Sequence, residues 1–244
     1  MIPLRDDNPT TGAPVLTVAL IAVNALVFLY QLSLSPRAGQ LFVYQFGAIP
    51  AVLFGSGDLP SSIAVIPPVL SLFTSMFLHA GWLHLIGNMW YLWIFGDNVE
   101  EAMGRVRFLV FYLLAGLIAA LTHALFSIGS DIPMIGASGA ISGVLGAYLI
   151  LYPRARVLVL LPLLWFYWRM FHIPAMFVLG LWFLLQILNG GLDSGAAGGV
   201  AWTAHVGGFV AGMLLVGIFK RSDVHFFNPP HRQVAAVEDP WLEK

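Results

Sequence analysis

The chain has 244 residues, of which 59% are hydrophobic and only 9% charged, and its formal net charge is -1. Ordinary globular proteins carry about a quarter charged residues, so a soluble domain would leave too much apolar surface uncovered. Composition therefore predicts a single helical domain that crosses a membrane several times. The absence of cysteine excludes disulfides, thiol nucleophiles and cysteine-bound metals. The near-neutral charge gives no reason to expect nucleic-acid binding.

A polar segment, 1–14, precedes the first apolar stretch. It contains Asp6 and Asp7, and it lacks both the basic start of a secretory signal and the Arg-rich, acid-poor composition of a transit peptide. We therefore expect a short cytoplasmic N-terminal segment and a first span that the mature protein retains.

Six apolar segments follow, and most approach the roughly 20 residues that a membrane-spanning helix needs. The fourth is short, with 15 residues. The pattern predicts an all-α polytopic membrane protein, a six-helix bundle with a short central fourth helix. This domain is expected to cover 15–220, followed by a cytoplasmic tail, 221–244. The predicted spans are Val15–Leu34, Phe73–Phe95, Phe108–Ile128, Ala137–Leu151, Ile173–Leu188 and Ala201–Phe219.

Basic residues indicate the orientation of these spans. With six alternating spans, every Lys and Arg except Arg37 falls on the side that holds the two termini. Because cytoplasmic loops carry an excess of Lys and Arg, both termini are predicted to be cytoplasmic. The expected location is the cell membrane.

Three connections between the spans are unusual. Segment 35–72 is long and half apolar, so we expect it to lie in the outer interface. Segment 157–169 is apolar and aromatic, which predicts either a stretch along the inner interface or an extension of the fifth span. Segment 193–199 is rich in glycine, as is typical of a mobile lid.

Ser138 and His205 lie at the same predicted depth. Each is 15 residues before the inner end of its span, at Pro153 and Lys220 respectively. At 1.5 Å per residue that is about 22 Å, inside a hydrocarbon core about 30 Å thick. The fourth span therefore begins within the bilayer, where irregular backbone is tolerated only beside protein or a watery cavity. We expect that cavity to open to the outer side.

Span two adds two polar side chains at this level. His84 and Asn88 are four residues apart, so they share a helix face. A neutral histidine donates from one ring nitrogen, and asparagine has two amide donors. With the backbone N–H of Ser138 and the positive end of the fourth helix, these donors suit an oxyanion.

Each of these residues also has an ordinary structural explanation. A serine in a membrane helix usually bonds the carbonyl four residues earlier, and an asparagine can cross-link helices. His79 would lie about 140° around the helix from His84, so it cannot share the donor face. We expect His79 and His123 to have structural roles. The shared depth favours one catalytic site. Four glycines are predicted to let spans four and six pack closely, which would bring the site residues together. They are Gly139, Gly143, Gly208 and Gly212.

Zinc catalysis is a competing interpretation, with His79, His84 and His205 as ligands. No predicted span contains Asp or Glu, and there is no His-Glu-x-x-His motif. The carboxylate that a metalloprotease needs is therefore missing, as are an aspartate pair and an intramembrane Ser-His-Asp triad. A Ser-His dyad without metal or cofactor remains.

The motifs around these residues resemble those of the rhomboid family of intramembrane serine proteases. The resemblance covers Val15–Phe219, with the family's order and spacing. Each motif is weak alone, but the set is specific. The matching motifs are His84-x-x-x-Asn88, Gly136-Ala-Ser138-Gly139 and Ala204-His205-x-x-Gly208-x-x-x-Gly212.

This resemblance implies a role for each matching residue. Ser138 is the implied nucleophile and His205 its general base. The implied oxyanion hole consists of His84, Asn88 and the N–H of Ser138, while Gly136 borders the substrate carbonyl. The implied activity is cleavage of transmembrane or membrane-tethered proteins near the outer face of the bilayer.

Two positions depart from the family pattern. Some members have a Trp-Arg pair in the first loop, where this chain has Leu70-Ser71. Some have a tyrosine that packs on the catalytic histidine, where this chain has Ser142. We therefore expect another aromatic residue, such as Phe209, to support His205.

Two other functions stay open on the sequence. A rhomboid-like pseudoprotease would bind membrane clients without cutting them, but it would be expected to lack Ser138 or His205. A small-solute transporter would suit a polar layer, but no inverted repeat is evident. The expected partners are transmembrane substrates and the lipid bilayer, and the oligomeric state is left open.

Overall fold

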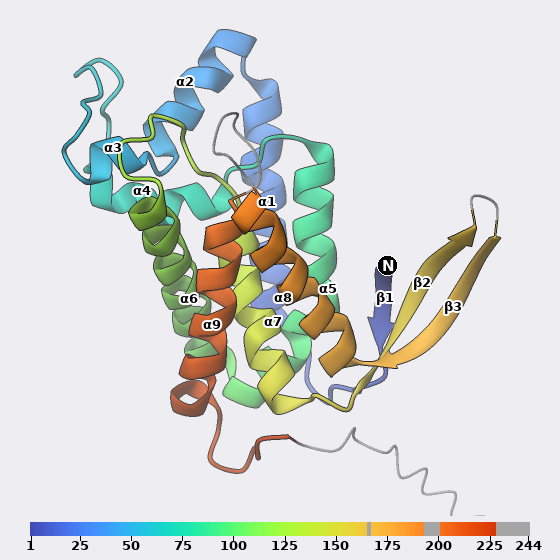
Figure 1. Cartoon of the computed structure of the whole chain (residues 1–244). Helices are drawn as coiled ribbons and strands as arrows, with labels where there is room; N and C mark the ends of the chain where they lie inside the picture. The colour runs from blue at the N-terminus through green and yellow to red at the C-terminus, as the bar shows by residue number, and fades with distance from the viewer. Residues whose placement is uncertain (165–166, 193–200, 228–244) are drawn as a thin grey trace, which may run out of the picture.

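A bundle of roughly aligned helices forms the body of the protein in the computed structural model, which describes residues 1–164, 167–192 and 201–227 (Figure 1). Apolar segments one, three, four, five and six of the sequence coincide with five of these helices to within a few residues. The bundle helices are α1 (Val15–Ser33), α5 (Trp82–Met103), α6 (Arg105–Phe126), α7 (Ser138–Leu151), α8 (Ala175–Leu192) and α9 (Trp202–Phe219).

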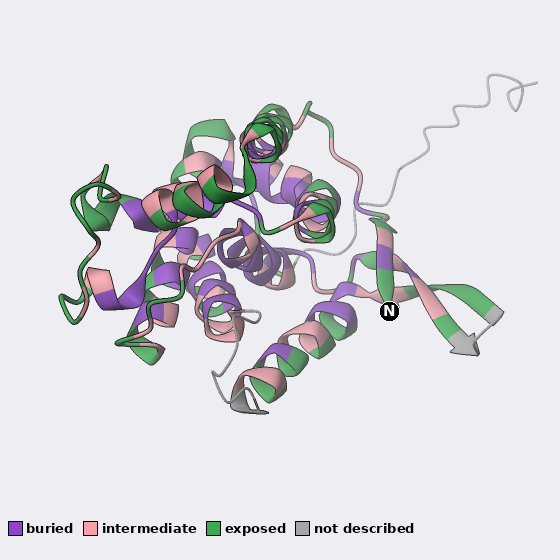
Figure 2. Cartoon of the chain, turned by 90° about the horizontal axis from the view of Figure 1, so that it is seen from above, coloured by how far each residue is buried: buried purple, intermediate pink, exposed green. Residues whose placement is uncertain are grey.

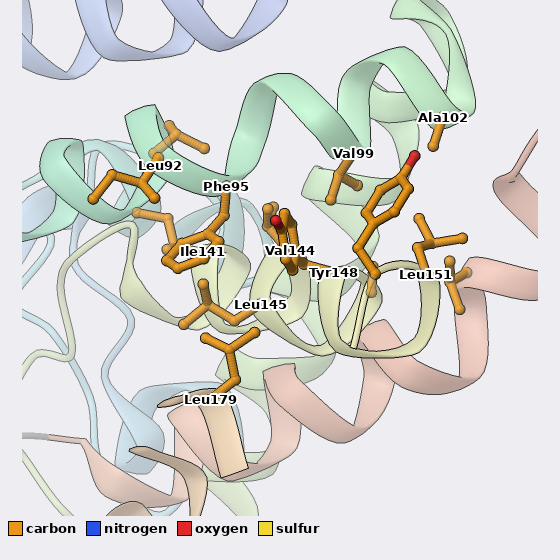
Figure 3. Packing of buried hydrophobic residues seen from close by; sticks show 14 of the residues in the cluster. Leu92, Phe95, Val99, Ala102, Ile141, Val144, Leu145, Tyr148, Leu151 and Leu179 are labelled. Carbon is orange, nitrogen blue, oxygen red and sulfur yellow. The ribbon is translucent and has the colours of Figure 1, made fainter. Parts of the chain in front are cut away.

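Helix α7 lies at the centre of the bundle. Nearly all of its residues are buried, as expected for a helix that is apolar all round. It packs against α5, α6, α8 and α9. Figure 2 shows buried residues gathered in the middle of the molecule and exposed ones on its outer faces. Side chains of α5 and α7 interdigitate, with Leu179 of α8 against them (Figure 3).

Glycines bring α7 and α9 into backbone contact. A Cβ added to Gly208 would overlap the carbonyl group of Gly139, and one added to Gly212 would overlap that of Gly143. A Cβ on Gly143 would lie 2.5 Å from the Cβ of Ala115 in α6 and 3.3 Å from the carbonyl oxygen of Gly208 in α9. Small residues at such crossings allow the close van der Waals packing that holds membrane helices together.

The described helices are those of a multi-pass membrane protein. Among the described residues, α1, α6 and α9 are each long and apolar enough to cross a membrane, and α7 and α8 are shorter apolar helices. The outward faces carry large apolar side chains that no other part of the chain covers, a surface suited to lipid rather than water. Examples are Leu83, Val106, Phe126, Leu214 and Ile218.

The second predicted span, Phe73–Phe95, is wrong at its start. Helix α4 (Pro68–Thr74) and the 3-10 helix η1 (Ser75–Phe77) are bent by 82° from α5, which begins only at Trp82. The broken backbone between them is satisfied by Gln31 of α1. Its Oε1 accepts from the N–H of His79 at 3.0 Å, and its Nε2 donates to the carbonyl of the same residue at 3.3 Å.

Helix α5 continues beyond the predicted end of the second span, Phe95, to Met103, and this extension carries acidic residues. Its last turns include Glu100, which is buried and caps the start of α1. The Glu100 carboxylate accepts from the N–H of Leu16 at 3.0 Å and from the N–H of Thr17 at 2.8 Å. A carboxylate at a helix N-terminus satisfies free N–H groups and complements the helix dipole.

The all-α prediction fails because the chain also forms an antiparallel sheet in the order β1-β2-β3. Strand β1 (Ile2–Asp6) pairs with β2 (Arg156–Leu164), which pairs with β3 (Tyr167–Pro174). Residues 157–164 and 167–169 thus lie in paired strands, so the predicted extension of the fifth span is wrong. A position along the inner interface stays a prediction. A short apolar run does not distinguish strand from helix, and Pro162 disfavours the helix interior.

The first long connection packs on the bundle. It contains α2 (Pro36–Phe46) and α3 (Pro50–Leu53), and it touches the loop before α7. Ala48 and Met134 exchange backbone hydrogen bonds at 3.0 and 2.8 Å. Its depth relative to a membrane stays a prediction. The glycine-rich segment 193–199 and the tail from 228 onward lie outside the described residues.

A half-buried carboxyl group joins the N-terminal strand to α7. The Asp6 carboxylate accepts a hydrogen bond from the hydroxyl of Tyr148. Burial raises the pKa of Asp6 to about 7; the Tyr148 hydrogen bond opposes the shift, and the nearby Asp97 and Asp7 add to it. Protonation of Asp6 therefore favours the folded chain.

We predict that Gly212→Ala destabilises the protein by about 1–3 kcal/mol, the usual cost of overpacking a core. The new methyl group would overlap the backbone of Gly143, which can yield only if α7 and α9 separate. Gly180→Ala in α8 is the matched control, because a Cβ there meets nothing within 4 Å. Denaturant unfolding in detergent micelles measures both, and equal midpoints for the two variants would contradict the prediction.

We predict that stability falls as pH rises and that Asp6→Asn weakens this dependence. The folded pKa of Asp6, about 7, exceeds its ordinary value of 3.8, so its contribution is complete below the lower value and is lost as pH rises through the higher one. Thermal unfolding midpoints at about pH 5 and about pH 8 measure the effect. Asp58→Asn, at an exposed carboxyl, is the control, and an unchanged pH dependence in Asp6→Asn would refute the assignment.

Candidate active site

The structure brings the Ser138 hydroxyl and the His205 ring together. Ser138 is the first residue of α7 and is partly exposed, whereas His205 lies near the start of α9 and is only 9% exposed. The Nε2 atom of His205 is 2.8 Å from the Oγ atom of Ser138. The close approach of the two helices, described above, makes this short contact between residues 67 positions apart possible.

Aromatic rings lie beside His205, as predicted, but they belong to two tryptophans and not to Phe209. The ring of Trp182 in α8 lies 5.9 Å away at an interplanar angle of 34°, and that of Trp202 lies 6.1 Å away and edge-on. Phe209 instead stacks on Phe183, with centroids 4.4 Å apart. Phe209 lies one helical turn after His205 in α9 and contacts α8 there.

The Ser142 hydroxyl bonds to the backbone of its own helix and not to the His205 ring. Its hydroxyl donates to the carbonyl of Ser138 at 2.6 Å, the ordinary bond of a helical serine to the residue four positions earlier. A neighbour of His205 that was not predicted from the sequence is Gln186 in α8. Its Oε1 atom is 2.7 Å from Nδ1 of His205. A polar side chain inside an apolar span was the signal that would have found it.

His84 and Asn88 meet over Gly136. Gly136 has a φ of +124°, and a Cβ on it would lie 2.7 Å from Nε2 of His84 and 3.8 Å from Nδ2 of Asn88. Nδ1 of His84 accepts from the N–H of Ala80 at 3.4 Å, which leaves its proton on Nε2. The Asn88 amide nitrogen is buried and has no hydrogen-bond partner among the described residues.

The loop that carries Gly136 is anchored on both sides of the site. The N–H of Gly136 donates to the carbonyl of Ser75 in η1 at 2.8 Å, and Met134 pairs with Ala48. Since Ser138 begins α7, its own N–H has no acceptor within the helix. Two further donors, Nε2 of His84 and Nδ2 of Asn88, lie next to Gly136, two residues before Ser138.

Two other histidines, His79 and His123, have different surroundings. His79 is buried, with its ring 5.0 Å from that of His84, although the helical spacing predicted that the two would diverge. The break before Trp82 removes that spacing. His123 contacts the hydroxyl of Thr203 at 2.9 Å, a link between α6 and α9. Within the described ranges, no three His, Cys, Asp or Glu residues are arranged to hold a metal ion.

This arrangement is suited to acyl transfer. A hydroxyl beside an imidazole nitrogen is the pairing that activates a serine nucleophile. Convergent N–H donors next to it are the arrangement that stabilises a tetrahedral oxyanion.

Comparison with known proteins points to one family. The family model described as Rhomboid domain matches residues 68–222. The chain is 36% identical over 118 residues to Presenilin-associated rhomboid-like protein A, mitochondrial, of Danio rerio, which covers 47% of the chain and 30% of that protein. It is 34% identical over 138 residues to Rhomboid protease GluP of Bacillus subtilis, covering 57% of the chain and 25% of GluP.

A plant protein gives a similar result. RHOMBOID-like protein 1 of Arabidopsis thaliana is 33% identical over 161 residues, covering 66% of the chain and 37% of that protein. The chain thus spans less than half the length of each of these relatives.

We predict that Gly136→Ala lowers the rate at which a fluorophosphonate modifies Ser138 by about a hundredfold, the usual effect of losing an oxyanion donor. The added methyl group would displace the His84 ring from its position. Gly129→Ala is the matched control, because Gly129 also has a positive φ, +88°, but a Cβ there meets nothing within 4 Å. Labelling followed over time measures both variants. If the Gly136→Ala and Gly129→Ala variants were labelled at equal rates, the prediction that the His84 contact matters would be contradicted.

Proposed function

This chain belongs to the rhomboid family, and from that premise we propose that it is an intramembrane serine endopeptidase. It cleaves transmembrane or membrane-tethered proteins near the outer membrane face through a Ser138–His205 dyad. The observation that carries the proposal is the 2.8 Å separation between Nε2 of His205 and Oγ of Ser138. The name of a relative, Rhomboid protease GluP, supports the same reaction class.

In the first half of the reaction, Ser138 Oγ attacks the carbonyl carbon of the substrate peptide. Neutral His205 takes the hydroxyl proton on Nε2 as the bond forms. The carbonyl oxygen becomes an oxyanion, to which the Ser138 N–H, His84 Nε2 and Asn88 Nδ2 donate. As this intermediate collapses, His205 gives its proton to the departing amine and an acyl-enzyme remains.

Water completes the second half by the same route. His205 removes a proton from a water molecule, whose oxygen attacks the acyl carbonyl carbon. The tetrahedral intermediate again rests on the oxyanion donors. Its collapse returns the proton from His205 to Ser138 Oγ and releases the new carboxylate end. No metal or cofactor takes part in this scheme.

The proposed topology has six spans within 15–220, formed by α1, α5, α6, α7, α8 and α9, with segments 1–14 and 221–244 in the cytoplasm. The distribution of Lys and Arg supports this orientation in a cell membrane. Relatives named as mitochondrial exist, so the membrane itself is part of the proposal. Helix α7 has 14 residues, about 21 Å at 1.5 Å each, which supports a start inside the bilayer.

Substrate is proposed to enter from the lipid beside α8. This helix packs on α7 and α9 less extensively than those two helices pack on each other. Its outward face is apolar, with Phe177, Leu181 and Leu185 exposed. A loosely held helix next to the site is suited to move aside for a transmembrane segment.

We predict that Ser138→Ala abolishes both cleavage of a model transmembrane substrate and labelling by a fluorophosphonate. His205→Ala is expected to lower both by about ten-thousandfold or more, because the hydroxyl then has no base. Protein reconstituted in liposomes and followed by gel analysis of the cleavage products gives both measurements. Ser33→Ala, which removes an exposed hydroxyl in α1, is the control and should behave as the wild type.

The alternatives have distinct results in the same assay. A pseudoprotease would show neither cleavage nor labelling in the folded wild-type protein. Cleavage that persists in Ser138→Ala would refute the serine mechanism.

A further inference from the structure

A third side chain contacts the proposed dyad from a third helix. Gln186 of α8 is 6% exposed, and its Oε1 atom lies 2.7 Å from Nδ1 of His205. The opposite ring nitrogen, Nε2, faces Ser138 at 2.8 Å. The imidazole is therefore held between one hydrogen-bond partner on α7 and another on α8.

The orientation of the Gln186 amide follows from its second contact. Its Nε2 atom donates to the carbonyl of Trp182, one turn earlier in α8, at 3.2 Å. A carbonyl can only accept, so the amide nitrogen must point toward Trp182 and the amide oxygen toward His205. An amide oxygen likewise can only accept, which places a proton on Nδ1 of His205.

That proton decides what the other ring nitrogen can do. A neutral imidazole with its proton on Nδ1 presents a lone pair on Nε2, the form that can accept the Ser138 proton. With the proton on Nε2 instead, the ring would donate to the serine oxygen and could not act as its base. The amide oxygen of Gln186 supplies the buried acceptor that this tautomer needs.

We propose that Gln186 is a positioning residue that fixes the tautomer and orientation of His205. This inference rests on the proposed protease function and deepens it. Gln186 does not touch the substrate carbonyl or the attacking oxygen; it acts through the imidazole. During the reaction its oxygen also accepts from the positively charged imidazolium.

The placement of Gln186 ties the site to α8. The same helix supplies Trp182, whose ring lies 5.9 Å from that of His205. Both supports of the imidazole on this side therefore depend on α8 packing against α9. A displacement of α8 large enough to break the 2.7 Å contact leaves His205 free to change tautomer. The base is fully prepared only when α8 is in place.

The first test compares variants of Gln186. Gln186→Met keeps the length of the side chain but removes the acceptor, and we expect kcat for a transmembrane substrate to fall by about ten- to a hundredfold with little change in KM. Gln186→Glu keeps an oxygen acceptor and is expected to recover kcat to within about threefold of wild type. Asn189→Leu, a polar-to-apolar change in the same helix, is the control and should leave kcat unchanged.

The second test reads the tautomer directly and does not need activity. In protein labelled with 15N-histidine, nitrogen chemical shifts distinguish protonated from unprotonated ring nitrogens, and comparison with His205→Ala assigns the resonances. We expect His205 to carry its proton on Nδ1 in the wild type and to populate both tautomers in Gln186→Met.

The outcomes separate this inference from the proposed function. Unchanged kcat and an unchanged tautomer in Gln186→Met would overturn the inference while leaving the protease intact. An equal loss in the folded Met and Glu variants would also overturn it, because the role would then be packing. A tautomer change in a protein that neither cleaves nor labels would support the positioning of His205 and refute the protease.

Discussion

The backbone contact between α7 and α9 is the constraint on which the site depends. Gly208 lies against the carbonyl of Gly139, and Gly212 against that of Gly143, so no side chain separates the two helices there. Lipid offers no hydrophobic driving force between helices, and close van der Waals packing must hold them. Because His205 lies one turn before Gly208, this packing sets the distance between its ring and the start of α7.

Because the central helix α7 is short, irregular backbone lies next to the site, and other parts of the chain satisfy its hydrogen-bonding groups. The irregular backbone on either side of the site would leave polar groups without partners in a low-dielectric interior. Gln31 satisfies the break before α5, and Ser75 and Ala48 bind the loop before α7. The same bonds hold His84 and Gly136 against each other. The same hydrogen bonds thus stabilise the irregular backbone and position the proposed oxyanion donors.

Much of the candidate site was accessible from the sequence. Apolar length located the helices, because a helix in lipid must be apolar over most of its surface. A count of residues to the inner boundary placed Ser138, His205, His84 and Asn88 in one layer, since the helical rise is constant. The close packing at Gly139, Gly143, Gly208 and Gly212 was also predictable, because small residues at helical spacing in an apolar helix are typical of a helix–helix contact.

Contacts between segments far apart in the chain could not be predicted from the sequence. The hairpin around Pro162, the break before Trp82 and the partners of His205 each depend on which elements meet in space. Sequence determined that the chain is helical, crosses a membrane and carries a serine and a histidine at one depth, because apolar length and helical rise are local properties. Only the tertiary structure decided that Gln186 and Trp182 hold the imidazole, because α8 reaches it from a position that no local pattern encodes.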